Sequence, residues 1–163
     1  MWVIKWLFIL ASALTVSAIV AGQTGLLHGE TPADLGVRQG KLKGPSATEN
    51  SVSSQADLYQ DHPQRKHASI APLPVRGEGP ATIARLRSIV KGMDGAKLIT
   101  TAPDYLYAQY TTRLMQYVDD VEFWFDPGSN VIQVRSASRL GESDLGVNRK
   151  RIEAVRAALV AAP

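Results

Sequence analysis

An apolar run near the N-terminus constrains this chain more than any other feature. Residues 2–21 read WVIKWLFILASALTVSAIVA, with Lys5 as the one charge and no proline. Roughly 20 apolar residues in a helix, at about 1.5 Å each, match the ~30 Å hydrocarbon layer of a bilayer. Because the run is apolar on every side, it predicts a transmembrane segment over residues 1–22, in preference to a buried core helix.

The charges around the run predict its orientation. Lys5 lies at the N-terminal end, whereas the first Lys or Arg after the run is Arg38, and Glu30 and Asp34 precede it. Segments rich in Lys and Arg stay in the cytoplasm. We therefore expect a single pass through the inner (cytoplasmic) membrane, with the N-terminus inside and the C-terminal domain in the periplasm or outside.

A cleaved signal peptide is the alternative interpretation of the same run. Residues 20–22 (Val-Ala-Gly) are small and stand ahead of Gln23, as a cleavage site requires, although no Ala-x-Ala sequence is present. Cleavage near Gly22 would leave a secreted or periplasmic protein. Under both interpretations, the rest of the chain is exported across the membrane.

The composition limits the classes of function. A chain of 163 residues holds one ordinary domain, and 45% hydrophobic with 20% charged residues is typical of a globular one. The net charge of +3 is spread over both signs, so nucleic-acid binding is not expected. The absence of cysteine excludes a disulfide framework, a thiolate metal site and a lipoprotein anchor.

Residues 23–66 show neither a helical nor an alternating period. Glycine and proline recur here among Ser, Thr, Asn and Gln. A stretch of this length is either a tether or an irregular arm packed over the domain, and Leu35, Val37 and Leu42 favour the arm. The predicted organisation is a membrane segment at 1–22, an irregular arm or linker at 23–66 and a domain at 67–163.

The periodic part of the chain predicts an α+β fold. Residues 70–75 suit an extended edge segment, and a helix begins at Pro80 and ends by Gly92. Alternating bulky residues predict strands at 97–101, 105–112, 118–126 and 131–139, and a last helix begins at about Asn148. We expect an antiparallel four-stranded sheet with one helix before it and a C-terminal helix packed on one face.

An acidic cluster on the third predicted strand is the first candidate site. Its members are Asp119, Asp120, Glu122 and Asp126. Asp120 or Glu122 would serve as the base of a hydrolase, or the cluster would bind a cation. The alternative, which we favour, is that the acids pair with Arg113, Arg135 and Arg139 across the strands in a solvated, salt-bridged sheet face.

A corner rich in hydroxyl and basic groups is the second candidate site. Ser136 and Ser138 lie on the side that the strand buries, and Asn148 and Arg149 open the last helix. With Arg113, Arg135 and Arg139 they would bind a small anionic or lipid-like ligand at a helix N-terminus. Alternatively, Asp144 or Asn148 caps the helix and the serines satisfy loop backbone.

The remaining motifs give no sign of a metal or cofactor. His28, His62 and His67 fall in the irregular segment without a third ligand, so no metal site is predicted. Neither a Gly-x-Ser-x-Gly sequence nor a phosphate-binding loop occurs.

Residues 117–156, YVDDVEFWFDPGSNVIQVRSASRLGESDLGVNRKRIEAVR, carry a family resemblance. Through VDDVEF, VRSASR and SDLGVNR the chain resembles the bacterial and plastid family called domain of unknown function 1499. The likeness extends back through IAPLP and NSVSSQA to DLGVR, and so covers about residues 31–163. It implies that the irregular segment belongs to the domain. Relatives often carry two cysteines where Gly44 and Ser51 stand, so no disulfide holds that segment here.

The family resemblance implies no activity, and three hypotheses remain. The first is a ligand-binding or accessory module in the cell envelope, held at the membrane through residues 1–21. The second is a structural or assembly protein that contacts an envelope partner through residues 34–56. The third is a hydrolase that uses the acidic cluster at 119–126.

Overall fold

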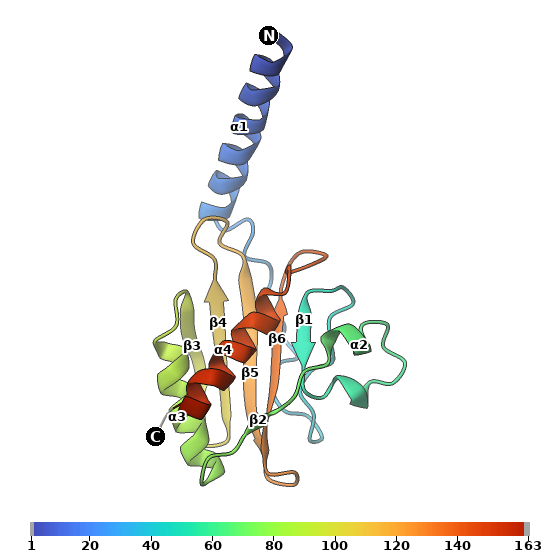
Figure 1. The fold of residues 1–163 in the computed structure, drawn as a ribbon, viewed down its shortest axis with the longest axis vertical. Helices are drawn as coiled ribbons and strands as arrows, with labels where there is room; N and C mark the ends of the chain where they lie inside the picture. Colours follow the sequence, from blue (N-terminus) through green and yellow to red (C-terminus); the bar gives the residue numbers. More distant parts are fainter. Residues whose placement is uncertain (1, 162–163) are drawn as a thin grey trace.

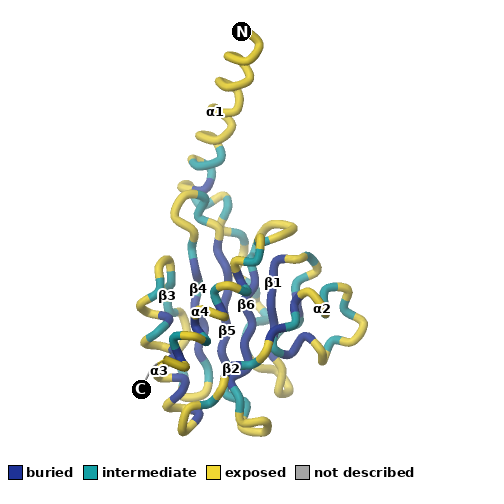
Figure 2. Tube along the Cα trace, viewed as in Figure 1, coloured by how far each residue is buried: buried dark blue, intermediate teal, exposed yellow. Residues whose placement is uncertain are grey.

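The structure is a computed structural model that describes residues 2–161. Helix α1, Trp2–Gln23, extends away from the domain, and Gly22 is its one buried residue (Figures 1 and 2). Within residues 2–161 it is the one helix long and apolar enough to cross a membrane. A signal sequence has the same length and composition, so α1 by itself fits a membrane span or a signal sequence.

The domain is built on one antiparallel sheet with strand order β1-β6-β5-β4-β3, in which β2 also pairs with β6. The four strands predicted from the sequence are present, but the sheet described within residues 2–161 has six. The strands are β1 (Ser51–Ser53), β2 (Leu73–Pro74), β3 (Ala96–Thr101), β4 (Tyr105–Thr111), β5 (Val118–Asp126) and β6 (Val131–Ser138).

The two additional strands are too short to show an alternating pattern. Strand β1 is Ser-Val-Ser and β2 is Leu-Pro. Both pair along β6, whose edge would otherwise leave backbone N–H and C=O groups unpaired. Because β1 comes from the irregular segment at 23–66, that segment contributes a strand to the sheet.

Two helices cover one face of the sheet, α3 (Gly79–Lys91) and α4 (Val147–Ala161), as Figure 1 shows. Pro80 lies in the first turn of α3 and Gly92 caps its end, as the sequence predicts. A 3-10 turn η1 (Ala56–Leu58) and a short helix α2 (Arg65–Ala68) lie beside β1. The core between helices and sheet contains Ile83, Leu86, Val90, Ile152, Val155, Leu159, Leu106, Val121, Phe123 and Val134.

The opposite face of the sheet is covered by part of the irregular segment at 23–66. From here on, 'the arm' means residues 29–48 of that segment. Leu42 in the arm is 1% exposed. Its backbone N–H donates to Oε1 of Gln55 at 2.8 Å, and its carbonyl accepts from the Tyr59 hydroxyl at 2.6 Å. These contacts attach the arm to the domain.

If the arm is an integral part of the fold, Leu42→Ala will destabilise the protein. Removing a fully buried leucine side chain costs about 2–5 kcal/mol. The matched control is Val37→Ala in the same arm, where the side chain is 37% exposed and a change within about 0.5 kcal/mol is expected. Urea unfolding of the full-length protein in detergent micelles measures both. Equal midpoints for the two variants would show that the arm does not pack on the sheet.

Candidate functional site

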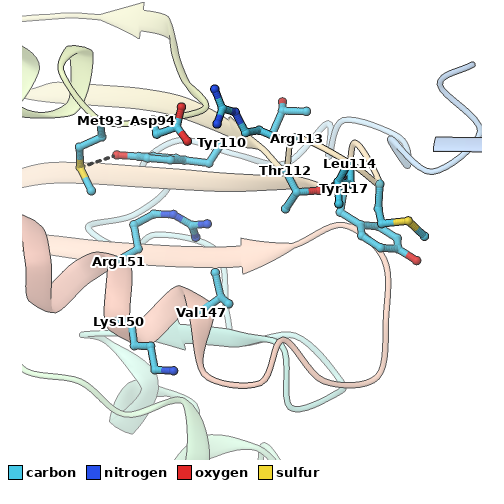
Figure 3. A pocket seen from close by; sticks show the side chains of 12 residues that line it. Met93, Asp94, Tyr110, Thr112, Arg113, Leu114, Tyr117, Val147, Lys150 and Arg151 are labelled. Atoms are coloured by element: carbon cyan, nitrogen blue, oxygen red, sulfur yellow. Dashed lines mark hydrogen bonds between the residues drawn. The ribbon is translucent and has the colours of Figure 1, made fainter. Parts of the chain in front are cut away.

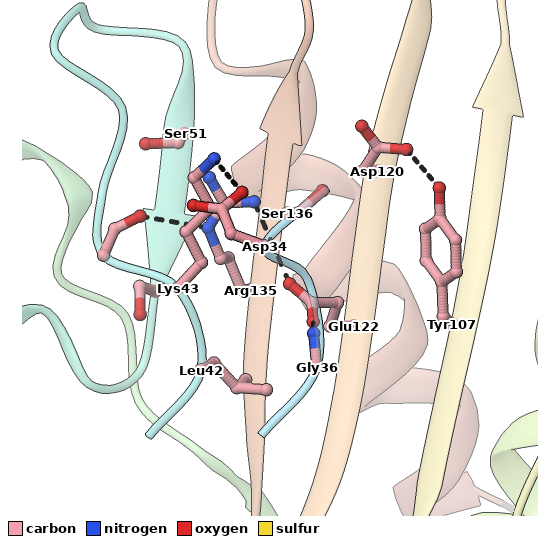
Figure 4. A network of polar contacts seen from close by, with 12 residues as sticks. Asp34, Gly36, Leu42, Lys43, Ser51, Tyr107, Asp120, Glu122, Arg135 and Ser136 are labelled. Atoms are coloured by element: carbon pink, nitrogen blue, oxygen red, sulfur yellow. Dashed lines mark hydrogen bonds and ion pairs between the residues drawn. The ribbon is translucent and has the colours of Figure 1, made fainter. Parts of the chain in front are cut away.

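A charged layer lies between the sheet and the arm, on the face away from α3 and α4 (Figure 4). In the register of β5 and β6, Glu122 is paired with Arg135, as the alternating pattern predicts. Asp120 lies on the same face, because side chains two residues apart on a strand point the same way. Tyr105 and Tyr107 of β4 reach these carboxylates from the neighbouring strand.

The charged layer is buried, and the expectation of a solvated face is wrong. Asp120 is 1%, Glu122 0% and Arg135 3% exposed. Alternation along a strand shows which side chains share a face, but it does not show what covers that face. Here the arm covers that face and shields it from bulk solvent, so each charge needs a compensating partner.

Asp120 has a full set of partners. Nε and Nη2 of Arg139 donate to its two carboxylate oxygens at 2.9 and 2.8 Å, and the Tyr107 hydroxyl donates at 2.6 Å. The hydrogen bond to Asp120 raises the pKa of Arg139. A two-point guanidinium–carboxylate pair of this kind is strong and fixed in direction. Asp120 is therefore a structural group, because both of its carboxylate oxygens already accept hydrogen bonds from the protein.

Glu122 has partners on one oxygen only. Oε1 accepts from the backbone N–H of Gly36 in the arm at 2.7 Å and from the Tyr105 hydroxyl at 2.7 Å. Oε2 has no hydrogen-bond partner within the described residues and lies 4.0 Å from Nη1 of Arg135. Burial raises the pKa of Glu122. Burial also raises the pKa of the Tyr105 hydroxyl, and the negative charge of the neighbouring Glu122 raises it further.

Arg135 is a buried cation whose donors are only partly used. Its Nε donates to the Gly44 carbonyl in the arm at 3.1 Å, and Glu122 is the one acid within 4.0 Å among residues 2–161. In the part of the chain that the structure describes, neither Nη group makes a hydrogen bond. Burial lowers the pKa of this guanidinium. A guanidinium has five N–H donors, so Arg135 can still accept an anionic partner.

The arm and the sheet enclose a cleft of about 290 Å³ at Arg135. Three cations line it: Lys43 from the arm, and Arg135 and Arg139 from the sheet. Lys43 also holds Asp34 of the arm at 2.6 Å. Two carboxylates, Glu30 and Asp120, complete the charged lining. Lys43 and Arg139 are paired with acids, so the unused donors of Arg135 are the part of this cleft suited to a small phosphate or carboxylate.

The predicted serine corner lies on the other face of the sheet, under α4. The Ser136 hydroxyl donates to Oδ1 of Asn148 at 2.5 Å, and the Asn148 amide donates to Ser138 Oγ at 3.0 Å. Arg151 donates to the same Asn148 oxygen at 2.7 Å and to Asp119 at 2.5 Å. This buried network joins β6 to α4, and its Ser138 also lines the cleft between arm and sheet.

The start of α4 is capped by Asp144, as in the alternative to a ligand-binding corner. The carboxylate of Asp144 accepts the backbone N–H groups of Asn148 at 2.7 Å and of Gly146 at 2.9 Å. Arg149 donates to the carbonyls of His67 and Ser69 at 2.7 and 2.9 Å and so holds the segment before β2.

The residues predicted to form one binding corner are therefore divided among separate places. Arg135 and Arg139 share the arm cleft. Ser136, Ser138 and Asn148 belong to the network under α4, and Arg113 lies in the β4–β5 loop beside the end of α1.

Sequence reasoning missed four residues of these networks: Lys43, Tyr105, Tyr107 and Arg151. A signal existed for two of them. Tyr105 and Tyr107 alternate with the core residues Leu106 and Ala108, which places them on the face of Asp120 and Glu122. Lys43 gave no such signal, because it lies in an irregular segment.

Fold and site together define a class of protein: an α+β domain that follows one apolar helix, with helices on one sheet face and a charged layer under an arm on the other. A family model described as Protein of unknown function (DUF1499) matches residues 41–159. The chain belongs to this family, as the motifs of residues 117–156 suggest. No curated protein and no solved structure matches it.

The raised pKa of Glu122 predicts a specific pH dependence of stability. The folded protein holds this proton more tightly than the unfolded chain, whose carboxyl has the ordinary value of 4.5. The stabilisation is therefore complete below pH 4.5 and is lost as the pH rises through the raised folded pKa. Glu122→Gln cannot ionise, so the unfolding free energy of the wild type should fall relative to this variant as the pH rises.

Urea unfolding of both proteins over a pH series measures the difference. The control is Glu142→Gln, a substitution at an exposed position that should leave the profile of the wild type unchanged. A difference between wild type and Glu122→Gln that stays constant above pH 4.5 would refute the raised pKa.

Proposed function

We propose that this protein is a membrane-tethered binding module of the cell envelope that holds a small anion in the cleft between arm and sheet. The observation that supports this most is Arg135, which is 3% exposed and uses only its Nε in a hydrogen bond among the described residues. A phosphate or carboxylate in the cleft would meet its two Nη groups. Lys43 and Arg139 would supply further positive charge.

Desolvation supports an anionic ligand. Burying a cation is costly unless a partner compensates, and the carboxylate of Glu122, at 4.0 Å, is beyond hydrogen-bond distance. An anion with two oxygens matches the planar fork of a guanidinium and would form two charge-assisted hydrogen bonds. Such a ligand would also join the two sides of the cleft, because Lys43 belongs to the arm and Arg135 to the sheet.

We propose further that α1 is retained as a membrane anchor, with the domain on the periplasmic side. The Gln23 side chain donates to the carbonyls of Arg113 at 3.1 Å and Leu114 at 3.0 Å. Gly22 packs so closely on the Met115 backbone that a side chain would not fit there. Cleavage after Gly22 would remove the packing of Gly22 on Met115 and would separate Gln23 from the helix that positions it. Lys5 on the N-terminal side supports an inside N-terminus.

The geometry supports the two alternatives less. A hydrolase would use Glu122, whose burial and raised pKa suit a general base, but the arm cleft is lined by Asp120 and not by Glu122. An assembly protein would present residues 34–56 to a partner. Leu42 and β1 of that segment are buried in its own domain, which leaves mainly the turn between Arg38 and Lys41 for such a contact.

Arg135→Gln tests the binding proposal. The full-length protein is purified gently from the membranes of its host, and native mass spectrometry detects any small anion that it carries. A charge-assisted hydrogen bond contributes about 1.5–3 kcal/mol, so the occupancy of the anion should fall about tenfold or more in Arg135→Gln. Arg139 is a poorer choice for substitution, because its loss would leave the buried Asp120 without its ionic partner and with the Tyr107 hydroxyl alone.

Two further variants complete that experiment. Arg85→Gln removes an exposed arginine of α3 and should carry as much anion as the wild type. Lys43→Gln, at the partly exposed wall of the cleft, should carry less without loss of folding. A wild-type protein that carries no anion, or an Arg135→Gln protein that carries as much as the wild type, would refute the proposal.

A further inference from the structure

A second and larger groove, of about 820 Å³, lies at the end of the domain next to α1 (Figure 3). Its walls come from three segments far apart in the sequence: the turn after α3, the end of β4 with its loop to β5, and the first turns of α4. Met93, Tyr110, Leu114 and Val147 give it an apolar lining. Its volume is within the range of about 300–1,000 Å³ that is usual for ligand sites.

The groove is attached directly to the end of α1. The β4–β5 loop that forms one wall accepts the hydrogen bonds of Gln23 at its Arg113 and Leu114 carbonyls, and its Met115 backbone packs on Gly22. Helix α1 has 22 residues, which at about 1.5 Å each match the ~30 Å hydrocarbon layer. If α1 spans a membrane, the groove lies at the level of the lipid head groups.

Exposed apolar side chains gather at the same end of the domain. Leu26 after α1, Leu114 in the β4–β5 loop and Leu145 in the β6–α4 loop are 75%, 65% and 85% exposed. Figure 1 shows both loops at the end of the domain from which α1 emerges. Large exposed leucines on neighbouring loops are typical of a surface that contacts a partner or a membrane.

Two cations of the groove have no protein partner in the described structure. The side chains of Arg113 and Lys150 line the groove and form neither an ion pair nor a hydrogen bond within residues 2–161. Arg151, by contrast, is used by Asp119 and lies over the Tyr110 ring at 4.5 Å. Asp94 is the one acid among the lining residues. Free positive charge beside an apolar groove complements an anionic head group with its acyl chain.

We propose that this groove binds one anionic glycerophospholipid from the leaflet next to the domain. An acyl chain lies along Met93, Leu114 and Val147, and the phosphate meets Arg113 and Lys150. The inference rests on a membrane-spanning α1, which is part of the proposed function, and it is independent of the anion cleft at Arg135. The lipid would draw the membrane-facing end of the domain against the bilayer.

Photo-crosslinking of the full-length protein tests this proposal. The protein is reconstituted in vesicles of phosphatidylcholine and phosphatidylglycerol in equal parts, with a trace of phosphatidylglycerol that carries a diazirine in its acyl chain. Mass spectrometry then maps the adducts. We expect adducts on residues 110–117 and 147–151 in addition to those on α1. A phosphatidylcholine probe with the same chain should give clearly fewer adducts on these two segments.

Variants separate a bound lipid from ordinary membrane contact. Arg113→Gln with Lys150→Gln should lower the adducts on the two segments about 25-fold and leave those on α1 unchanged, because each basic side chain near an anionic surface contributes about fivefold. Val147→Trp fills the groove without a change of charge and should have the same effect. The matched control is Arg85→Gln with Arg87→Gln, a pair of exposed arginines on α3.

Each contrary result would overturn the proposal. Adducts confined to α1 would show only the lipids around a membrane helix, and unchanged adducts in the double variant would remove Arg113 and Lys150 from any site. Equal labelling by the phosphatidylcholine probe would exclude selection for an anionic lipid. Arg135→Gln should keep the wild-type adducts, so a failure of the anion cleft would be distinguishable from a failure of the groove.

Discussion

The burial of charge on one face of the sheet is the constraint on which the rest of the structure depends. Asp120, Glu122 and Arg135 project from central strands into a buried layer under the arm, where an unpaired ion is costly. Arg139 satisfies Asp120, whereas Glu122 and Arg135 depend on the backbone of the arm for Gly36 N–H and the Gly44 carbonyl. An apparently irregular segment is therefore a required layer of the fold.

This dependence connects the fold to the proposed function. On the helix side of the sheet, Ser136, Asn148 and Arg151 use one another as hydrogen-bond partners. On the arm side, Arg135 keeps N–H donors that no group among the described residues uses, at the cleft between the arm and the sheet. The end of the domain next to α1 presents a groove in which the side chains of Arg113 and Lys150 have no partner within residues 2–161. The proposed function, a tethered module with an anion cleft and a lipid groove, would use both of these sites.

The sequence predicted the parts of the fold that have a period, and it missed those that depend on contacts between distant segments. Alternation placed Glu122 beside Arg135 and away from Phe123. It could not show that the arm covers this face, nor that Ser51–Ser53 joins the edge of β6, because three residues carry no period. Asn148 is four residues before Ile152 on the buried stripe of α4, which indicates a buried amide instead of a ligand contact.

Hydrogen exchange of the arm amides in the full-length protein tests the central claim most directly. The N–H groups of Gly36 and Leu42 donate to buried Glu122 and Gln55, whereas the N–H of Gly40, in the same arm, has no partner within the described residues. We predict slow exchange at Gly36 and Leu42 and fast exchange at Gly40. Exchange at Gly36 and Leu42 as fast as at Gly40 would mean that the arm does not cover the charged layer, and would contradict the account.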